Sequence, residues 1–435
     1  MNTLDFKQHR QRALERLGPD EAILLFASSP AVRTGTSTYR YRPNSDLFWL
    51  TGWEQPEAVA VLRHGDKPFT LFVRPRDVHA EMWEGARPGP DGAMERFGAD
   101  AAYPIHELEQ HLPGLLTGVS RLHYAFGHNA DRDAIVRTAI RKSINAGRKQ
   151  GYWGPEHFSD HSVLLHELRL VKQHDEIDAM REAGRITALA HKAIMRGTRP
   201  GMHEYEVESM LLDVFRRNGS TGPGYTSIVA GGANATCLHY TDNNQPLNAG
   251  ELILVDAGAE HTFYTADVTR TYPISGTFSA VQRAVYDHVL DAQLRAIEAV
   301  RVGATFSAIH DGVVRRLVEG LLDLGLLHGG VDERIEDGSY KKYYPHGTGH
   351  WLGLDVHDVG TYGRNGVNRP FVDGMVLTIE PGIYVPADDL DAHPDFRGIG
   401  IRIEDDILVS GDTPEVLTSD APKHPKDIEA WIAAR

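Results

Sequence analysis

The second part of the chain repeats one order of elements, and each copy places carboxylates in otherwise apolar strands. Helical patterns over 174–196 and 203–218 precede a histidine-bearing loop and two strand-like runs. The same order returns with a helix from Ser279, where Gln282 is spaced for a capping box, and a helix over 306–325. The four acidic runs are Leu252–Asp256, Thr265–Val268, Met375–Glu380 and Ile401–Glu404. This repeated order of elements predicts a pseudo-symmetric sheet whose acidic pairs converge on one face.

The four carboxylates of these runs predict bound cations. One acidic residue among apolar neighbours is typical of a strand-end turn or a salt bridge, but four in repeated positions need compensating charge. Arg402 shares a strand face with Glu404, because side chains alternate, and it neutralises only one carboxylate. Two divalent ions would balance all four, with neutral His350 completing the set. Such oxygen-rich ligands favour Mn²⁺ over Zn²⁺.

Three histidines, His346, His350 and His357, lie within twelve positions in a glycine-rich segment. Glycines there indicate an extended segment with close backbone approach rather than a helix. A lone histidine among 23 is more often a surface or core residue than a ligand, and His239 is ambiguous by itself. For these three clustered histidines, both interpretations stay open: a functional site, or ordinary surface and core residues.

The N-terminal third favours a separate α/β domain. A chain of 435 residues is too long for one ordinary core. A charged amphipathic helix is expected over 5–17, and short apolar runs predict strands at Ala22–Phe26, Ala58–Leu62 and Phe69–Val73. We expect the domain boundary between residues 172 and 173, where glycine and proline give way to a long helical pattern.

Charge and composition exclude several classes of partner. The formal charge of −15, from 45 basic and 60 acidic residues, argues against nucleic acid and anionic membranes. The sequence contains no run of about 18 apolar residues, so we do not expect a membrane span. The first seven residues carry charges where a secretory signal needs an apolar run, and the single Cys237 excludes an internal disulfide. We therefore expect a cytoplasmic protein.

Several motifs together resemble the pita-bread metallopeptidases, the superfamily of methionine aminopeptidase, prolidase and aminopeptidase P. The motifs are Val255–Ala259 with Asp267, His346–His350, Glu380–Gly382 and Arg402–Asp405. Residues His350–Gly360 resemble the branch that cleaves Xaa-Pro bonds, and Arg42–Gly52 resemble the opening domain of aminopeptidase P. The resemblance implies an aminopeptidase-P-like α/β domain over 1–172. It also implies an α+β pita-bread catalytic domain over 173–435, with a pseudo-two-fold repeat of helices and a curved antiparallel sheet.

The resemblance also implies a role for each matching residue. The ligands of two divalent ions would be Asp256, Asp267, His350, Glu380 and Glu404. Glu380 would also take the proton of a water bridging the metals, and His357 and His239 would act near the scissile carbonyl. Substrate contacts would come from His346, Arg402 and Tyr384, and from Trp83 and Asp46 of a neighbouring subunit.

The expected reaction is hydrolysis of the N-terminal Xaa-Pro bond of a peptide, which releases the first residue, by a homodimer or homotetramer. A prolidase, restricted to dipeptides, is the nearest alternative, and related sites hydrolyse organophosphorus esters. From a different class, metal-free pita-bread proteins act as binding modules, and creatinase hydrolyses its substrate without metal. Both metal-free alternatives are disfavoured because no ligand is missing from this sequence.

Overall fold

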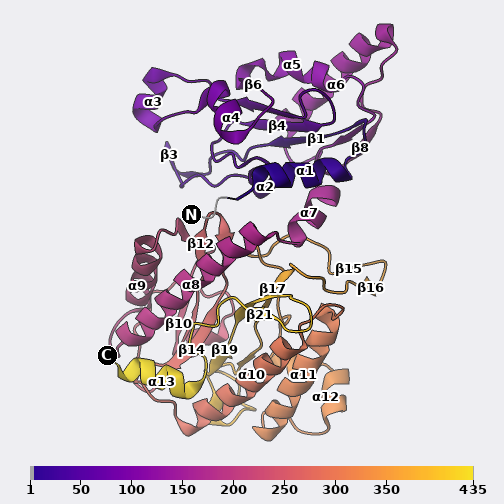
Figure 1. The fold of residues 1–435 in the computed structure, drawn as a ribbon. Helices are drawn as coiled ribbons and strands as arrows, with labels where there is room; N and C mark the ends of the chain where they lie inside the picture. Colours follow the sequence, from indigo (N-terminus) through magenta and orange to yellow (C-terminus); the bar gives the residue numbers. More distant parts are fainter. Residues whose placement is uncertain (1–3, 435) are drawn as a thin grey trace. The chain divides into compact units, whose positions relative to one another are not determined.

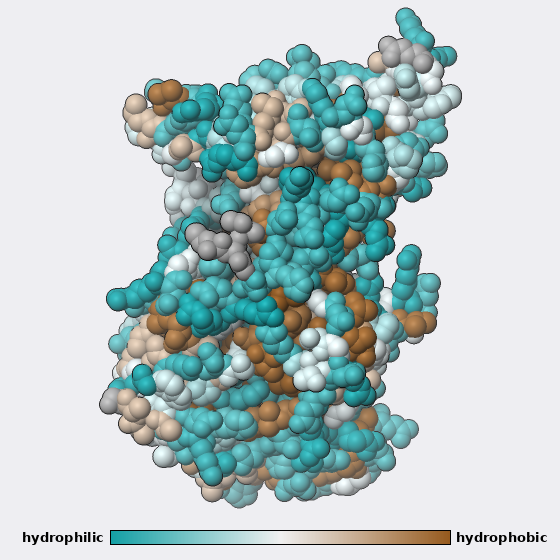
Figure 2. Space-filling view, viewed as in Figure 1, coloured by the Kyte–Doolittle hydropathy of each residue, from teal (hydrophilic) through white to brown (hydrophobic). Residues whose placement is uncertain are grey.

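The computed structural model describes residues 4–434 and divides the chain into two compact units, separated between Arg169 and Leu170 (Figure 1). This division falls three residues before the expected boundary. On the face shown in Figure 2, hydrophilic side chains dominate and hydrophobic ones form smaller patches between them. Among residues 4–434, no helix combines the length and apolar character that crossing a membrane requires.

A six-stranded mixed sheet forms the centre of the first unit, in the order β6-β5-β4-β1-β7-β8. These strands are β1 (Glu21–Phe26), β4 (Val59–Arg63), β5 (Phe69–Val73), β6 (Ala101–Pro104), β7 (Arg121–His123) and β8 (His157–Ser159). The helices are α1 (Phe6–Arg16), α2 (Ser45–Thr51), α3 (Val78–Glu84), α4 (Gly89–Phe97), α5 (Leu108–Leu115), α6 (Ala130–Gly147) and α7 (Ser162–Leu170). A short β2-β3 hairpin (Val32–Thr34, Ser37–Thr38) completes the unit. The predicted α/β character, the first helix and the three predicted strands are confirmed.

In the second unit, both halves contain a helix pair followed by nested antiparallel strands. The helices are α8 (His174–Gly197), α9 (Glu204–Arg217), α10 (Ala280–Ala299), α11 (Phe306–Asp323), α12 (Val331–Glu336) and α13 (Pro425–Ala433). Apolar side chains of α8 to α11 pack with those of the strands in one core. The predicted capping box is confirmed, because Ser279 Oγ accepts from Gln282 N at 3.2 Å and Gln282 Oε1 from Ser279 N at 2.9 Å.

The strands of the two halves follow one plan. In the first half β11 (Leu252–Asp256) pairs with β14 (Thr269–Pro273) around the hairpin β12 (Ala259–His261) and β13 (Tyr264–Thr265). In the second half β17 (Val376–Ile379) pairs with β20 (Asp405–Leu408) around β18 (Gly382–Tyr384) and β19 (Gly400–Arg402). The remaining strands are β9 (Gly222–Pro223), β10 (Ile228–Gly231), β15 (Gly363–Arg364), β16 (Val367–Asn368) and β21 (Glu415–Val416). The pairings described in this unit are all antiparallel, and the shared nesting of the two halves gives the predicted repeat a structural basis.

The acidic residues lie at strand ends and in breaks between strands, which corrects the prediction that Asp267 and Glu404 lie within strands. Asp267 falls between β13 and β14, and Glu404 between β19 and β20. The reason is that their backbone N–H groups bond outside their own strands: that of Asp267 donates to the Asp406 carboxylate, and that of Glu404 to Thr269 O at 3.1 Å. Each break turns a carboxylate towards the same point.

Candidate metal centre

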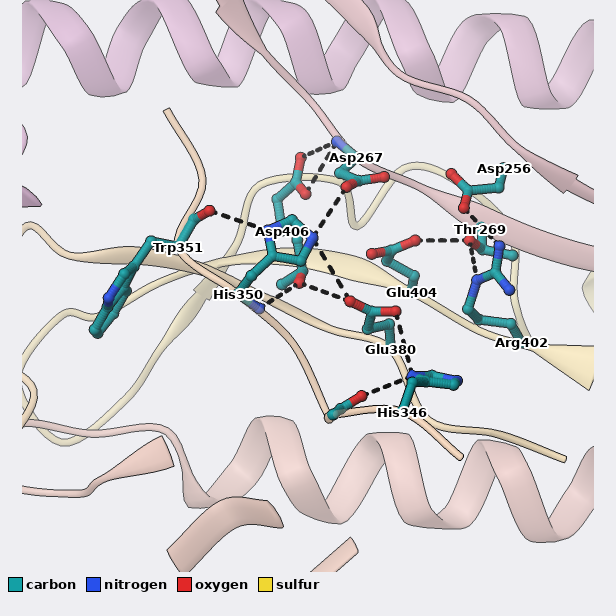
Figure 3. A network of polar contacts seen from close by, with 12 residues as sticks. Asp256, Asp267, Thr269, His346, His350, Trp351, Glu380, Arg402, Glu404 and Asp406 are labelled. Atoms are coloured by element: carbon teal, nitrogen blue, oxygen red, sulfur yellow. Dashed lines mark hydrogen bonds and ion pairs between the residues drawn. The ribbon is translucent and has the colours of Figure 1, made fainter. Parts of the chain in front are cut away.

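The five predicted ligands converge within the second unit (Figure 3). Ligand atoms of Asp267, His350 and Glu404 all lie within 4.8 Å of one another. Glu380 Oε1 lies 3.6 Å from His350 Nε2, and Tyr225 links Asp256 to Asp267 with contacts of 2.6 and 2.5 Å. The two halves therefore contribute to one centre, since Asp256 and Asp267 come from the first and the other three from the second.

Glycines make this convergence possible at two places. A Cβ on Gly258 would lie 1.7 Å from Ala266 O, and a Cβ on Gly349 would lie 1.8 Å from Thr378 O. The first contact brings the end of β11 against the break that carries Asp267. The second lets the histidine segment lie along β17, where Thr378 N donates to His350 O at 2.9 Å. The predicted close backbone approach is confirmed.

His350 is oriented as a ligand by the backbone. Its Nδ1 lies 3.0 Å from Trp351 O, so Nδ1 carries the proton and donates. Nε2 then faces Asp267 Oδ2 at 3.4 Å and Glu380 at 3.6 Å. Burial alone would lower the pKa of His350, but the hydrogen bond and charge of Asp267, together with Glu380, raise it to about 9. The imidazole thus faces a strongly negative centre, as a metal ligand does.

Arg402 and Thr269 hold the carboxylates of Asp256 and Glu404 in place through hydrogen bonds. Arg402 Nη2 donates to Asp256 Oδ2 at 2.6 Å, and its Nε donates to Thr269 Oγ1 at 3.0 Å. Thr269 Oγ1 in turn donates to Glu404 Oε2 at 2.6 Å. Arg402 Nη1 also donates to Tyr384 OH at 3.1 Å, so the predicted Arg402–Tyr384 pair belongs to this network.

The electrostatics of the centre fit divalent cations. Burial raises the pKa of Glu380 to about 7, and the charges of Asp267 and Asp256 act in the same direction. Burial, followed by the charge of Asp267, raises the pKa of Glu404 well above its ordinary value. In the metal-free centre, Arg402 and protonated His350 supply two positive charges against four carboxylates, three of them buried and that of Glu380 partly buried. Two divalent cations would neutralise the negative charge of the four carboxylates. Carboxylates together with one neutral imidazole are also the donors that hard cations prefer.

The predicted histidines line a cavity of about 450 Å³ over the centre. His239, His346 and His357 share its wall with all five ligands and Arg402. The ring centroids of His350 and His357 are 4.4 Å apart in an edge-to-face contact. His346 Nε2 accepts from Tyr384 OH at 2.8 Å, while its Nδ1 donates to Gly347 O at 2.7 Å. Burial and the charge of Arg402 lower the pKa of His346 to about 4, so this imidazole is neutral near pH 7.

Trp83 and Asp46 lie in the first unit in contrasting environments. Trp83, on α3, has 79% of its surface exposed. Asp46, on α2, is 6% exposed and accepts hydrogen bonds from its own unit, with Arg169 at 2.7 Å, His161 at 3.2 Å and His166 at 3.3 Å. A carboxylate engaged in this way has the surroundings of a structural group. The contribution of Asp46 to a neighbouring subunit's site stays a prediction, and the hydrogen bonds of Asp46 within its own unit do not favour it.

Sequence reasoning missed three residues that touch the ligands. Tyr225 bonds Asp256 and Asp267, Thr269 bonds Glu404, and Asp406 accepts from the backbone of Asp267 at 3.1 and 3.2 Å. Asp406 carried a signal, because it adds a further acidic residue to an apolar strand directly after Glu404 and Asp405. Tyr225 carried none, since it is one loop tyrosine among 16.

Family comparisons agree with this geometry. The model described as "Metallopeptidase family M24" matches residues 178–411, and the one described as "Aminopeptidase P, N-terminal domain" matches residues 6–124. The chain belongs to metallopeptidase family M24. The expected resemblance to pita-bread metallopeptidases is confirmed, as is the combination of an aminopeptidase-P-type N-terminal domain with a pita-bread domain.

Within that family, the chain is similar over its whole length to aminopeptidase P proteins. The Xaa-Pro aminopeptidase of Escherichia coli is 42% identical over 433 residues, which cover 99% of this chain and 98% of the relative. The solved structure of Pseudomonas aeruginosa aminopeptidase PepP matches with a TM-score of 0.97 at 41% identity, covering 100% of this chain and 99% of that one. A variant of Escherichia coli aminopeptidase P in complex with substrate matches with a TM-score of 0.94 at 41% identity, covering 99% and 98%.

Proposed function

We propose that this metallopeptidase removes the first residue from peptides whose second residue is proline, using two divalent cations held by Asp256, Asp267, His350, Glu380 and Glu404. The observation that carries the proposal is the complete ligand set gathered under a cavity lined by three further histidines. The similarity to Xaa-Pro aminopeptidases over 98% of the relative's length supports the choice of substrate.

In the proposed reaction, the residues of the centre have different chemical roles. Bound divalent cations supply an activated water and Lewis-acid polarisation of the scissile carbonyl. Glu380, whose carboxylate lines the cavity beside His350, accepts a proton on a carboxylate oxygen and returns it to the leaving nitrogen. Tyr225, Arg402 and Thr269 keep the other carboxylates in place while this proton moves.

The cavity wall would bind the substrate around the scissile bond. His357 and His239 line this cavity, and in the proposed reaction they donate hydrogen bonds to the carbonyl oxygen as negative charge develops on it. The scissile nitrogen belongs to proline and has no N–H, so recognition depends on the shape of the ring. Ile228, Leu238 and Val356 give the cavity apolar surface against which that ring would pack.

Mn²⁺ is the proposed metal, and the cytoplasm is the proposed location. Four carboxylates and one imidazole suit Mn²⁺ better than a site rich in cysteine and histidine would. A solved structure of Escherichia coli aminopeptidase P is described as zinc-substituted, so that relative accommodates zinc. Cys237 is the single cysteine of the chain and is exposed, and a protein without an internal disulfide suits a reducing compartment. Chelation should abolish activity, and Mn²⁺ should restore it better than Mg²⁺; activity that survives chelation would contradict the metal assignment.

A homodimer or homotetramer is the proposed assembly, with Trp83 contributing to the site of a second copy. On α3, Val78, Met82 and Trp83 have 78, 75 and 79% of their surfaces exposed, and Figure 2 shows hydrophobic side chains on the surface at α3. Neighbouring exposed apolar side chains are typical of an interaction surface. Replacing Trp83 by Ala should raise KM or lower the mass of the assembly measured by sedimentation. A variant that is unchanged in both quantities would contradict this role for Trp83.

The deciding experiment compares three peptides in the presence of Mn²⁺. Release of arginine from Arg-Pro-Pro, with Ala-Ala-Ala uncut, supports the proposed function. Cleavage of the dipeptide Ala-Pro alone would identify a prolidase instead. If metal binds but no proline peptide is cut, the proposed substrate is wrong, while the family assignment is unaffected.

A further inference from the structure

The loop that carries His239 has little regular structure of its own. After β10 the chain forms a short 3-10 helix (Gly232–Thr236) and then runs to β11 with no helix or strand in this described stretch. In the described stretch after Gly231, which pairs with Ile253 at the end of β10, an isolated bridge between His203 and Pro246 is the one further ladder contact. The last residue of β10, the 3-10 helix and this irregular stretch together, residues 231–247, are called the His239 loop below. Something outside the loop must fix it if His239 is to hold a defined position.

Glu204, the first residue of α9, supplies four hydrogen bonds to this loop. Its side chain is fully buried, and among residues 4–434 no cationic side chain pairs with it. Oε1 accepts from Gly231 N at 2.8 Å and from Asn234 Nδ2 at 2.9 Å. Oε2 accepts from Tyr240 OH at 2.7 Å and from Gln245 N at 2.9 Å. Because a carboxylate offers about four acceptor positions, this one is filled by donors from a single loop.

These bonds bracket His239 on both sides. Gly231 and Asn234 precede it, and Tyr240 and Gln245 follow it. The side chains next to His239 are also packed, since Leu238 and Tyr240 contact the buried cluster that includes Tyr384. His239 itself is exposed and faces the cavity. Its position therefore depends on the anchored residues around it.

We propose that Glu204 is a positioning residue that holds His239 at the cavity wall. This inference rests on the proposed function insofar as it gives His239 a role in turnover. Glu204 touches neither the cavity nor the ligands, so it acts only through the loop. A carboxylate is required because a glutamine would place an NH₂ group against one of the two donor pairs, and two donors cannot bond each other.

The test uses the isosteric variant Glu204→Gln, with Glu208→Gln on the same helix as control. Glu204→Gln should lower kcat on a Xaa-Pro peptide by roughly 10- to 100-fold, with bound metal unchanged, because misplacement by about 1 Å has this effect. Glu208→Gln should match the wild type. If Glu204→Gln fails to fold, Tyr240→Phe removes one anchor bond, keeps the packing, and should show a smaller loss of the same kind.

A double-mutant cycle with His239→Ala separates positioning from general damage. If Glu204 acts through His239, Glu204→Gln should cause little further loss of kcat once His239 is absent. Multiplicative losses would overturn the proposal. Hydrogen exchange of residues 231–247 gives a readout independent of activity: faster exchange in Glu204→Gln supports the anchor, and unchanged exchange contradicts it. Should the wild type cleave no Xaa-Pro peptide, the exchange result still decides whether Glu204 anchors the loop.

Discussion

Asp256, Asp267 and Glu404, three of the proposed ligand carboxylates, are each oriented by a donor that bonds one of their oxygens. Tyr225 and Arg402 bond Asp256, and Thr269 bonds Glu404. Such partners determine which lone pairs face a metal, and their loss commonly weakens metal binding by about 10- to 100-fold. Thr269 is notable among them because a single hydroxyl connects the guanidinium of Arg402 to Glu404.

Replacing Thr269 by Val should weaken metal binding without removing a ligand. Valine keeps the shape of threonine but cannot donate to Glu404 or accept from Arg402. We expect the affinity for Mn²⁺, measured by calorimetric titration, to fall by roughly 10- to 100-fold. Thr138→Val, on the exposed face of α6, provides the matched control. An unchanged affinity in Thr269→Val would mean that the hydroxyl does not orient Glu404.

At the scale of elements, local patterns predicted what local forces determine. Apolar runs identified β11 and β17, and capping residues located the start of α10. The breaks that hold Asp267 and Glu404 were not predictable, because their backbone partners, Asp406 and Thr269, lie more than a hundred residues away. Likewise, the sequence carries no local signal for the four hydrogen bonds of Glu204, because an acidic residue in the first turn of a helix is common. The sequence did predict that the four carboxylates lie together, because negative charge buried in repeated positions is stable only beside compensating cations.

The loop that carries His357 is held by a buried ion pair. Lys172 Nζ lies 2.9 Å from Asp358 Oδ2, and both side chains are 1% exposed. Replacing Asp358 by Asn leaves the ammonium of Lys172 buried without its counter-charge. We expect a loss of stability of about 3–5 kcal/mol, measured by urea unfolding, together with reduced turnover because His357 is the neighbouring residue.

Two comparisons check this prediction for Lys172 and Asp358. The exposed pair Arg217–Asp213 offers the control, since Asp213→Asn should leave the unfolding midpoint unchanged. Combining Lys172→Met with Asp358→Asn should cost less than the sum of the two single changes, because neither charge is then left alone. Additive losses would show that the pair does not act as a unit.

For the molecule as a whole, the interior contains ionisable groups that respond to acid. Arg270, Lys423 and Gln293 all bond the fully buried Asp405, and the charge of Arg270 helps to hold the pKa of Asp405 far below its usual range despite burial. His191 is also fully buried, and its Nε2 donates to Ala257 O at 3.1 Å. Burial, followed by the charge of Arg270, lowers the pKa of His191 to about 4. Both groups make the folded state sensitive to acid, but in different pH ranges.

His191 should contribute an acid destabilisation between pH 6.5 and 4. In that range the unfolded chain binds a proton at this imidazole and the folded chain does not, so stability falls as the pH falls. With an unfolded pKa of about 6.5, the loss between pH 7 and pH 5 is about 2 kcal/mol. The variant His191→Gln keeps a donor for Ala257 O but cannot titrate, so its disadvantage relative to the wild type should shrink by that amount from pH 7 to pH 5. Urea unfolding of both proteins, with chelator present to keep them equally metal-free, measures the difference. A gap between their midpoints that stays constant with pH would show that His191 takes up its proton equally well in both states.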